Sequence, residues 1–284
     1  MSRTLALVGL GLIGGSLAAS LKTRNAPWRV RAADRRRSAL DYALDRGMID
    51  EAAPSASAAA EGADLVVLAT PVQAIRASLR EVGPGLRPGQ VVTDVGSTKA
   101  GILREAREVL PAGVSFVGGH PVAGTERSGV ESAVPGLFEG RTCVLTPTDD
   151  SDPRAVEAVT DLWHDLGAQV VCMAPETHDR VFALVSHLPH ALAYGLVDTV
   201  AGELEPEQAA LAGGSLRDFA RVTSGSPVVW REIFLENRDA LLYALDAFAG
   251  RIRVLHDAVS RGDAEALDRL LRRATETGDP SWRR

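Results

Sequence analysis

The sequence predicts an α/β domain with a doubly wound, mostly parallel sheet, followed by an all-helical domain. Apolar runs of strand length alternate with amphipathic helical patterns up to residue 173; the strand candidates are residues 5–8, 28–34, 65–70, 91–95, 114–117, 142–146 and 168–173. Apolar strands separated by helices are typical of parallel sheets covered on both faces. Beyond residue 173 apolar residues recur only at helical spacing. We therefore expect one domain at 1–173 and another at 174–284.

The composition is that of an ordinary soluble protein. The chain has 284 residues, 45% of them hydrophobic and 24% charged, and a net charge of −6. Its longest basic run is Arg35–Arg37, so nucleic-acid binding has no electrostatic support. We find no leader-like start and no uncharged apolar run of about 18 residues, so we expect no membrane partner and a cytoplasmic location. Cys143 and Cys172 lie in apolar runs, which predicts buried, reduced thiols.

A glycine turn between the first strand and the first helix predicts a dinucleotide site of the Rossmann type. Gly9 permits a tight turn, Gly11 allows backbone N–H groups to approach a pyrophosphate, and Gly14 allows close packing of the helix on the strand. Asp34 ends the second strand, where a carboxylate can accept both ribose hydroxyls. The other residues that we expect at the cofactor are Leu12, Ile13, Arg35, Thr70, Pro71 and Gly96.

The preferred cofactor is NAD, because a 2′-phosphate would meet the negative charge of Asp34. Arg35, Arg36 and Arg37 follow directly, and arginines there would stack on adenine or hold a 2′-phosphate. NADP therefore stays open as the alternative. Lys99 stands at the start of a helix, where we expect it to cap phosphate or structure.

Polar segments follow the ends of several strands, which is where ligands bind in doubly wound sheets. Residues 94–99 and 118–126 are such segments, and residues 186–190 and 217–221 add polar groups from the helical part. His120 is the candidate base, since a neutral imidazole takes up protons near pH 7. Arg221 is the candidate carboxylate clamp, because a guanidinium binds a carboxylate through two hydrogen bonds. Asp218, one helical turn earlier, would orient Arg221, although a surface ion pair is the alternative.

The helical part also predicts self-association. Long apolar patterns at 181–200 and 241–259 exceed what one small helical domain covers. We expect a homodimer formed through this domain, with a compact monomeric bundle as the alternative. His187 and His190 are spaced for a metal, but no acidic or thiol ligand lies near them in the sequence, so we expect no metal site.

Five segments together resemble the prephenate/arogenate dehydrogenase family of tyrosine biosynthesis. They are residues 9–16, 94–99, 119–124, 186–190 and 217–221, and they occur in the family's order. The resemblance implies a Rossmann domain followed by a helical dimerisation domain, with NAD as cofactor. It implies NAD-dependent oxidative decarboxylation of prephenate to 4-hydroxyphenylpyruvate, without a metal. Many members carry a C-terminal regulatory ACT domain, and we expect none in this chain.

The resemblance also implies roles for individual residues. His120 matches the catalytic histidine, and Ser97 matches a serine that orients it and contacts the substrate hydroxyl. The substrate-binding residues would be Arg221, His187, His190, Thr125, Glu126, Arg217, Asp218 and Trp230. A structural role is an equal alternative for Arg217. Core packing is an equal alternative for Trp230.

Three other functions compete with this interpretation. Arogenate and 4-amino-4-deoxyprephenate are alternative substrates that the sequence does not separate from prephenate. A β-hydroxyacid dehydrogenase would need a catalytic lysine in the helical part, and residues 175–284 contain no lysine. A non-catalytic NAD-binding module would bind the cofactor without turnover.

Overall fold

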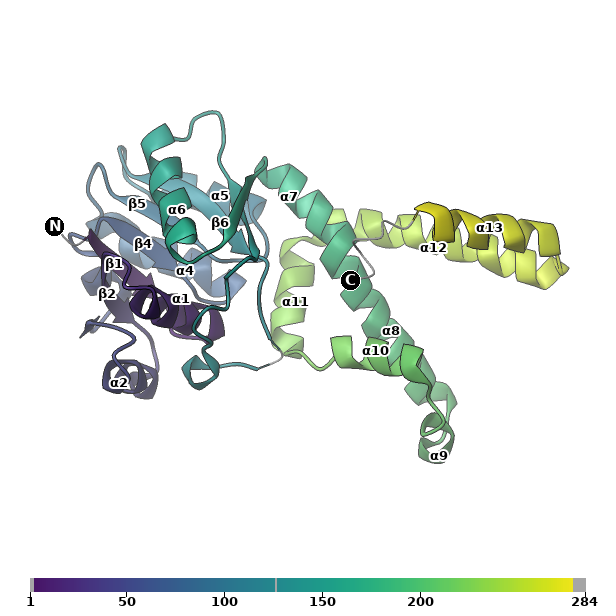
Figure 1. Ribbon diagram of the computed structural model, residues 1–284. Coiled ribbons are helices and arrows are strands. Elements are labelled where there is room, and N and C mark those ends of the chain that lie inside the picture. Colours follow the sequence, from purple (N-terminus) through teal and green to yellow (C-terminus); the bar gives the residue numbers. More distant parts are fainter. Residues whose placement is uncertain (1–2, 126, 278–284) are drawn as a thin grey trace. The chain divides into compact units, whose positions relative to one another are not determined.

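Eight strands form one sheet in the computed structural model, which describes residues 3–125 and 127–277 (Figure 1). The strands are β1 (Arg3–Val8), β2 (Trp28–Ala33), β3 (Glu51–Ala52), β4 (Leu65–Leu68), β5 (Val91–Asp94), β6 (Ser115–Pro121), β7 (Thr142–Thr146) and β8 (Gln169–Cys172). Their order is β3-β2-β1-β4-β5-β6-β7-β8, and only the β6–β7 pair is antiparallel. The predicted mostly parallel sheet is therefore confirmed.

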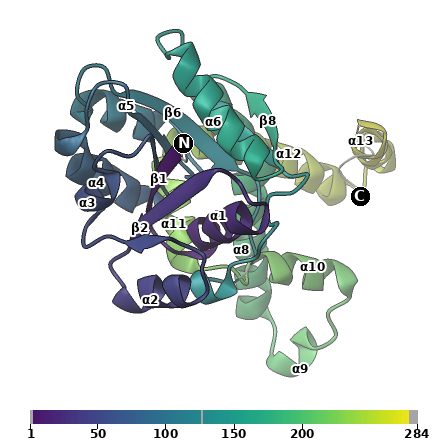
Figure 2. The same cartoon turned by 60° about the vertical axis from the view of Figure 1, so that its left-hand side comes forward.

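Helices cover both faces of this sheet (Figure 2). One face carries α1 (Leu12–Thr23), α2 (Arg37–Asp45) and α6 (Pro153–Asp165), and its core includes Leu17 and Trp163. The other face carries α3 (Ala56–Ala60), α4 (Val72–Val82) and α5 (Ala100–Val109), and its core includes Ile75 and Ile102. Short turns of helix, η1 (Gly83–Gly85) and η2 (Val130–Ser132), complete the connections. Burial on both sides explains why the central strands are apolar throughout.

The strand order reverses direction between β1 and β4, which places a crevice at their carboxyl ends. Two short elements, β3 and α3, were not among the expected ones, because two and five residues are too few to show a period. The expected burial of Cys172 is wrong. Cys172 is exposed because β8 is the last strand of the sheet and only one neighbour pairs with it, whereas Cys143 on β7 is buried.

Every described element after β8 is helical, as predicted. The helices are α7 (Pro175–Phe182), the π-helical turn η3 (Ala183–His187), α8 (Leu188–Glu203), α9 (Pro206–Ala209), α10 (Gly214–Val222), α11 (Pro227–Glu236), α12 (Arg238–Arg261) and α13 (Ala264–Thr277). Proline opens several of them, where its missing N–H has no helical partner to lose. The stretch Pro175–Glu203 is, among the described residues, the one helix long and apolar enough to cross a membrane by composition, with 22% of its apolar window buried.

The chain divides after Asn237 into two compact units. The first, Met1–Asn237, contains the sheet and α7 to α11; the second, Arg238–Arg284, contains α12 and α13, which pack against each other. Strands give way to helices between residues 172 and 175. The expected domain boundary after residue 173 stays a prediction.

Candidate active site

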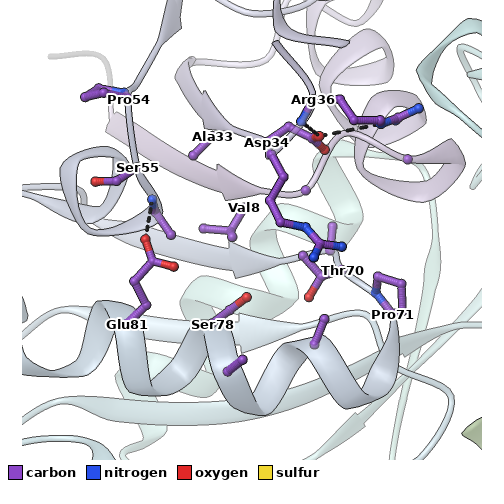
Figure 3. A pocket seen from close by; sticks show the side chains of 17 residues that line it. Val8, Ala33, Asp34, Arg36, Pro54, Ser55, Thr70, Pro71, Ser78 and Glu81 are labelled. Carbon is purple, nitrogen blue, oxygen red and sulfur yellow. Dashed lines mark hydrogen bonds and ion pairs between the residues drawn. The ribbon is translucent and has the colours of Figure 1, made fainter. Parts of the chain in front are cut away.

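A cavity of about 510 Å³ opens at the carboxyl ends of β1 and β4 (Figure 3). Six of the expected cofactor residues line it: Gly9, Gly11, Asp34, Arg35, Thr70 and Pro71. Leu12, Ile13, Gly14 and Gly96 are not among its lining residues. The crevice predicted from the glycine turn therefore exists, and its position is the one where doubly wound sheets bind dinucleotides.

The glycines of the turn have separate physical tasks. Gly9 has a φ of +100°, which favours glycine, and a Cβ on Gly14 would lie 2.1 Å from the Gly9 carbonyl oxygen. A Cβ on Gly11 would meet nothing within 4 Å, so the space above Gly11 is open. No side chain caps the N-terminus of α1 and no acidic residue lies in its first turn. These free N–H groups and the open space fit a pyrophosphate.

Asp34 stands beside the glycine turn and supports it. One carboxylate oxygen accepts a hydrogen bond from the Leu10 N–H at 2.7 Å, and the other accepts from the Arg36 N–H at 2.8 Å. The Arg36 guanidinium donates to the Leu10 carbonyl oxygen at 3.1 Å and lies 3.6 Å from Asp34. Arg35 also lines the cavity and forms no ion pair with another described residue. A dinucleotide ribose would therefore meet both the Asp34 carboxylate and the cationic Arg35 side chain.

A second polar cluster surrounds His120, which lies near the end of β6 and is 8% exposed. Its Nδ1 lies 2.8 Å from Nε2 of His178, and Nδ1 of His178 lies 2.8 Å from Oδ1 of Asp179. Phe182 packs on both imidazoles, with ring centroids 4.5 and 4.4 Å away. His178 and Asp179 lie on α7, so the helical segment supplies two members of this chain of three side chains.

The hydrogen-bond directions follow from the carboxylate. Asp179 accepts from the N–H groups of Lys99 and Ala100 as well as from His178. Burial raises the pKa of Asp179, but these hydrogen bonds outweigh it and hold the pKa below its ordinary value. An ionised Asp179 only accepts, so His178 donates from Nδ1 and accepts at Nε2 from the His120 Nδ1–H.

His120 is thereby left with an unprotonated Nε2. Burial, together with the nearby His178 and Lys99, lowers the pKa of His120 well below its ordinary value, so the imidazole is neutral near pH 7. Among the described residues the His178 contact is the one hydrogen bond of this side chain. An oriented neutral imidazole with a free nitrogen has the properties of a general base.

Lys99 and Asp94 connect the segment that follows β5 to the end of β6. They form a buried ion pair, and Lys99 also donates to the Gly119 carbonyl oxygen at 2.7 Å. Asp94 accepts from the N–H groups of Gly96 and Gly119 at 2.8 and 3.1 Å. The pair thus connects the segment of Ser97 to the segment of His120. Lys99 is the N-cap residue of α5 (Ala100–Val109), but its side chain makes no cap hydrogen bond there and forms this buried ion pair instead.

Two further histidines lie where α7 passes into α8. His187 is buried, and its Nδ1 accepts a hydrogen bond from Nδ2 of Asn237 at 3.0 Å. Asn237 also donates to the Asp179 carbonyl oxygen at 2.8 Å, so its amide orientation is determined. Burial lowers the pKa of His187 to about 4. His187 is therefore neutral and carries its proton on Nε2.

His190 follows Pro189, which lies in the first turn of α8 and does not break the helical path. Its Nδ1 donates to the Ser186 carbonyl oxygen at 2.9 Å, and its ring stacks on Trp230 with centroids 3.5 Å apart. Trp230 also faces His187 edge-on at 6.4 Å. Trp230 thus contacts both candidate histidines. Over the described residues no group of three or more potential metal ligands occurs.

Several expected site residues are not brought to His120. Ser97 is half-buried and forms no hydrogen bond with His120 or another described side chain. Arg217, Asp218 and Arg221 are exposed on α10, which packs on α8. The proposed Asp218–Arg221 pair does not form among the described residues. Thr125 is exposed and accepts from the Arg127 N–H, and Glu126 lies outside the described residues.

Sequence reasoning missed His178, Asp179 and Asn237. The available signal was the adjacent pair His178 and Asp179, three and four residues after Pro175, because an imidazole beside a carboxylate is a common proton-handling pair. Asn237 gave no signal, since its role depends on hydrogen bonds to Asp179 and His187, which lie 58 and 50 residues away along the chain.

Comparison with known proteins identifies the family of the chain. The model described as "Prephenate dehydrogenase, nucleotide-binding domain" matches residues 17–172, and the model described as "Prephenate dehydrogenase, dimerization domain" matches residues 174–273. The chain belongs to the prephenate dehydrogenase family.

Three similar proteins illustrate the relationship. Prephenate dehydrogenase of Bacillus subtilis is 38% identical over 98% of this chain and 76% of its own. The structure of prephenate dehydrogenase from A. aeolicus with hydroxyphenyl propionate and NAD+ has a TM-score of 0.88, 35% identity and 96% coverage of both chains. Synechocystis arogenate dehydrogenase has a TM-score of 0.84 and 33% identity, covering 96% of this chain and 98% of its own.

Proposed function

We propose that this protein is an NAD-dependent prephenate dehydrogenase that converts prephenate to 4-hydroxyphenylpyruvate and CO2. The observation that carries the proposal is the oriented, neutral His120 within a fold whose glycine-turn crevice fits a dinucleotide. Family membership and the NAD+ bound to the A. aeolicus relative support the choice of cofactor and substrate.

NAD, when bound, accepts a hydride from the substrate. His120 would receive the proton of the 4-hydroxyl group at Nε2 while the hydride leaves the carbon that bears this hydroxyl. Positive charge then does not build up on the hydroxyl oxygen. The ring carboxylate then departs as CO2, its bonding electrons complete the aromatic ring, and the proton returns to the phenol oxygen. His178 and Asp179 would keep the proton of neutral His120 on Nδ1 and thus keep Nε2 free.

The remaining site roles are part of this proposal. Ser97 would contact the substrate hydroxyl, and Arg221 would bind the side-chain carboxylate, with Arg217 and Asp218 beside it. His187, His190 and Trp230 would line the substrate pocket, and Thr125 and Glu126 would stand at its entrance. The ring contacts of Trp230 with both His187 and His190 support their assignment to one site.

We further propose a cytoplasmic homodimer formed through the helical domain. Val185 is 63% exposed, Leu184 48% and Val228 51% in the single chain, and apolar surface of this kind favours a protein partner. His178, Asp179 and His187 are polar residues within the apolar stretch Pro175–Glu203. Because polar side chains are costly in lipid, they argue against a membrane as the partner of this stretch. Analytical ultracentrifugation should give twice the mass of the chain; a monomer at micromolar concentration would refute the dimer.

The test of function is NADH formation by the purified protein. Prephenate, arogenate and 4-amino-4-deoxyprephenate are each assayed with NAD and with NADP, and prephenate with NAD should give the highest kcat/KM. A preference for arogenate or the amino compound would overturn the substrate assignment. NAD binding without turnover of any of the three would indicate a non-catalytic module instead.

A further inference from the structure

The cavity beside the glycine turn also has the character of a base-binding slot. Small apolar side chains line it, including Ala33, Pro54, Ala74 and Ala77. Polar side chains also line it: Glu81 of α4 points toward the segment of Ser55, and Ser78 lies on the same helix (Figure 3). An apolar slot with a polar edge suits a flat heteroaromatic ring that carries hydrogen-bonding groups on its rim.

Glu81 is held in place at this edge through one of its carboxylate oxygens. Oε1 accepts a hydrogen bond from the Ala56 N–H at 2.9 Å, and the Glu81 carbonyl oxygen accepts from the Ser57 hydroxyl at 2.7 Å. The second oxygen, Oε2, has no hydrogen-bond partner among the described residues and points into the cavity in Figure 3. The side chain is thus oriented by α3 and keeps an acceptor available.

We propose that Glu81 reads the base of the dinucleotide by accepting a hydrogen bond from the exocyclic 6-amino group of adenine. An ionised carboxylate only accepts hydrogen bonds, and this amino group is the one donor on the rim of the adenine base. Asp34, Gly9 and Gly11 line the same cavity as Glu81. Glu81 would then select adenine over a purine that lacks this donor. The inference rests on the NAD site proposed above.

A purely structural Glu81 is the competing explanation, in which the side chain only caps the first turn of α3. The two explanations differ in one measurable quantity, the ratio of the dissociation constants of NADH and of its counterpart with unsubstituted purine in place of adenine. Removal of the amino group deletes one donor and adds no polar group. A cap that does not contact the base leaves this ratio near 1.

Isothermal titration calorimetry of the full chain measures both dissociation constants without turnover. We expect the wild-type protein to bind NADH about tenfold more tightly than the purine counterpart, or ~1.4 kcal/mol. This is less than a buried charged hydrogen bond contributes, because Glu81 is exposed to water. In Glu81→Gln the oxygen still accepts from Ala56 while an amide N–H faces the amino group, so the ratio should fall below about twofold.

Glu61→Gln is the matched control, since it removes an exposed carboxylate that does not line the cavity. Its ratio should equal that of the wild type. A wild-type ratio near 1, or an unchanged ratio in Glu81→Gln, would overturn the inference, and the wild-type comparison needs no variant to fold. If the wild-type protein bound neither dinucleotide, the proposed NAD site itself would be refuted.

Discussion

Replacement of Lys99 by methionine should destabilise the protein by about 3–5 kcal/mol. The side chains of Lys99 and Asp94 are 1% and 0% exposed, so Lys99→Met leaves a carboxylate without its counter-charge in the interior. Asp94 would retain the N–H donors of Gly96 and Gly119, and the Gly119 carbonyl oxygen would lose its lysine donor. Methionine matches the length of the lysine stem, so the loss reports charge and hydrogen bonding more than cavity formation.

Urea unfolding at pH 7 measures this loss, and Lys22→Met provides the control. Lys22 pairs with Asp50 at 2.5 Å, but their side chains are 29% and 38% exposed. Such a pair contributes about 0–1 kcal/mol. Equal free energies of unfolding for Lys99→Met and Lys22→Met would refute the argument that the buried pair holds the two site segments together.

Two other perturbations test the site from different directions. Because the pKa of His187 is about 4 in the folded protein and 6.5 is its ordinary value, the unfolded chain takes up the proton first as pH falls. The stability that neutral His187 contributes is complete above pH 6.5 and declines toward pH 4. The loss is about 3 kcal/mol, because folding lowers the pKa of His187 from 6.5 to about 4. Urea unfolding across this range should show a steeper loss for wild type than for His187→Gln; parallel curves would contradict it. Gly11→Ala should fold with wild-type stability and bind NADH at least tenfold more weakly, whereas Gly14→Ala should lose stability because its Cβ meets the Gly9 carbonyl oxygen. Calorimetric binding and thermal unfolding of both variants decide this, and equal behaviour would contradict the separate roles.

The sheet and its crevice were predictable because their signals are local. Apolar runs bounded by glycine and proline predicted the central strands, and the glycine turn with Asp34 predicted the cavity that these residues line. His120 was predictable as a polar residue at a strand end. The partners of His120 were not predictable, because His178 lies 58 residues further along the chain and reaches His120 only through the tertiary fold.

The helical residues divide in an informative way. His187 and His190 were expected in one site, and their shared neighbour Trp230 is consistent with that. Arg217, Asp218 and Arg221 lie exposed on α10, so the fold of the single chain does not test the roles that the resemblance implies for them. The prediction of a buried Cys172 was wrong because a strand at the edge of a sheet can carry the same apolar residues as a buried strand.

The most direct test of the central claim is the turnover of prephenate by His120→Asn, with NADH affinity measured on the same sample. Loss of the base should lower kcat by at least about 10²-fold. The dissociation constant for NADH should stay at its wild-type value, because His120 does not line the cofactor cavity. A variant that bound NADH normally and kept wild-type kcat would contradict the assignment of His120 as the proton acceptor.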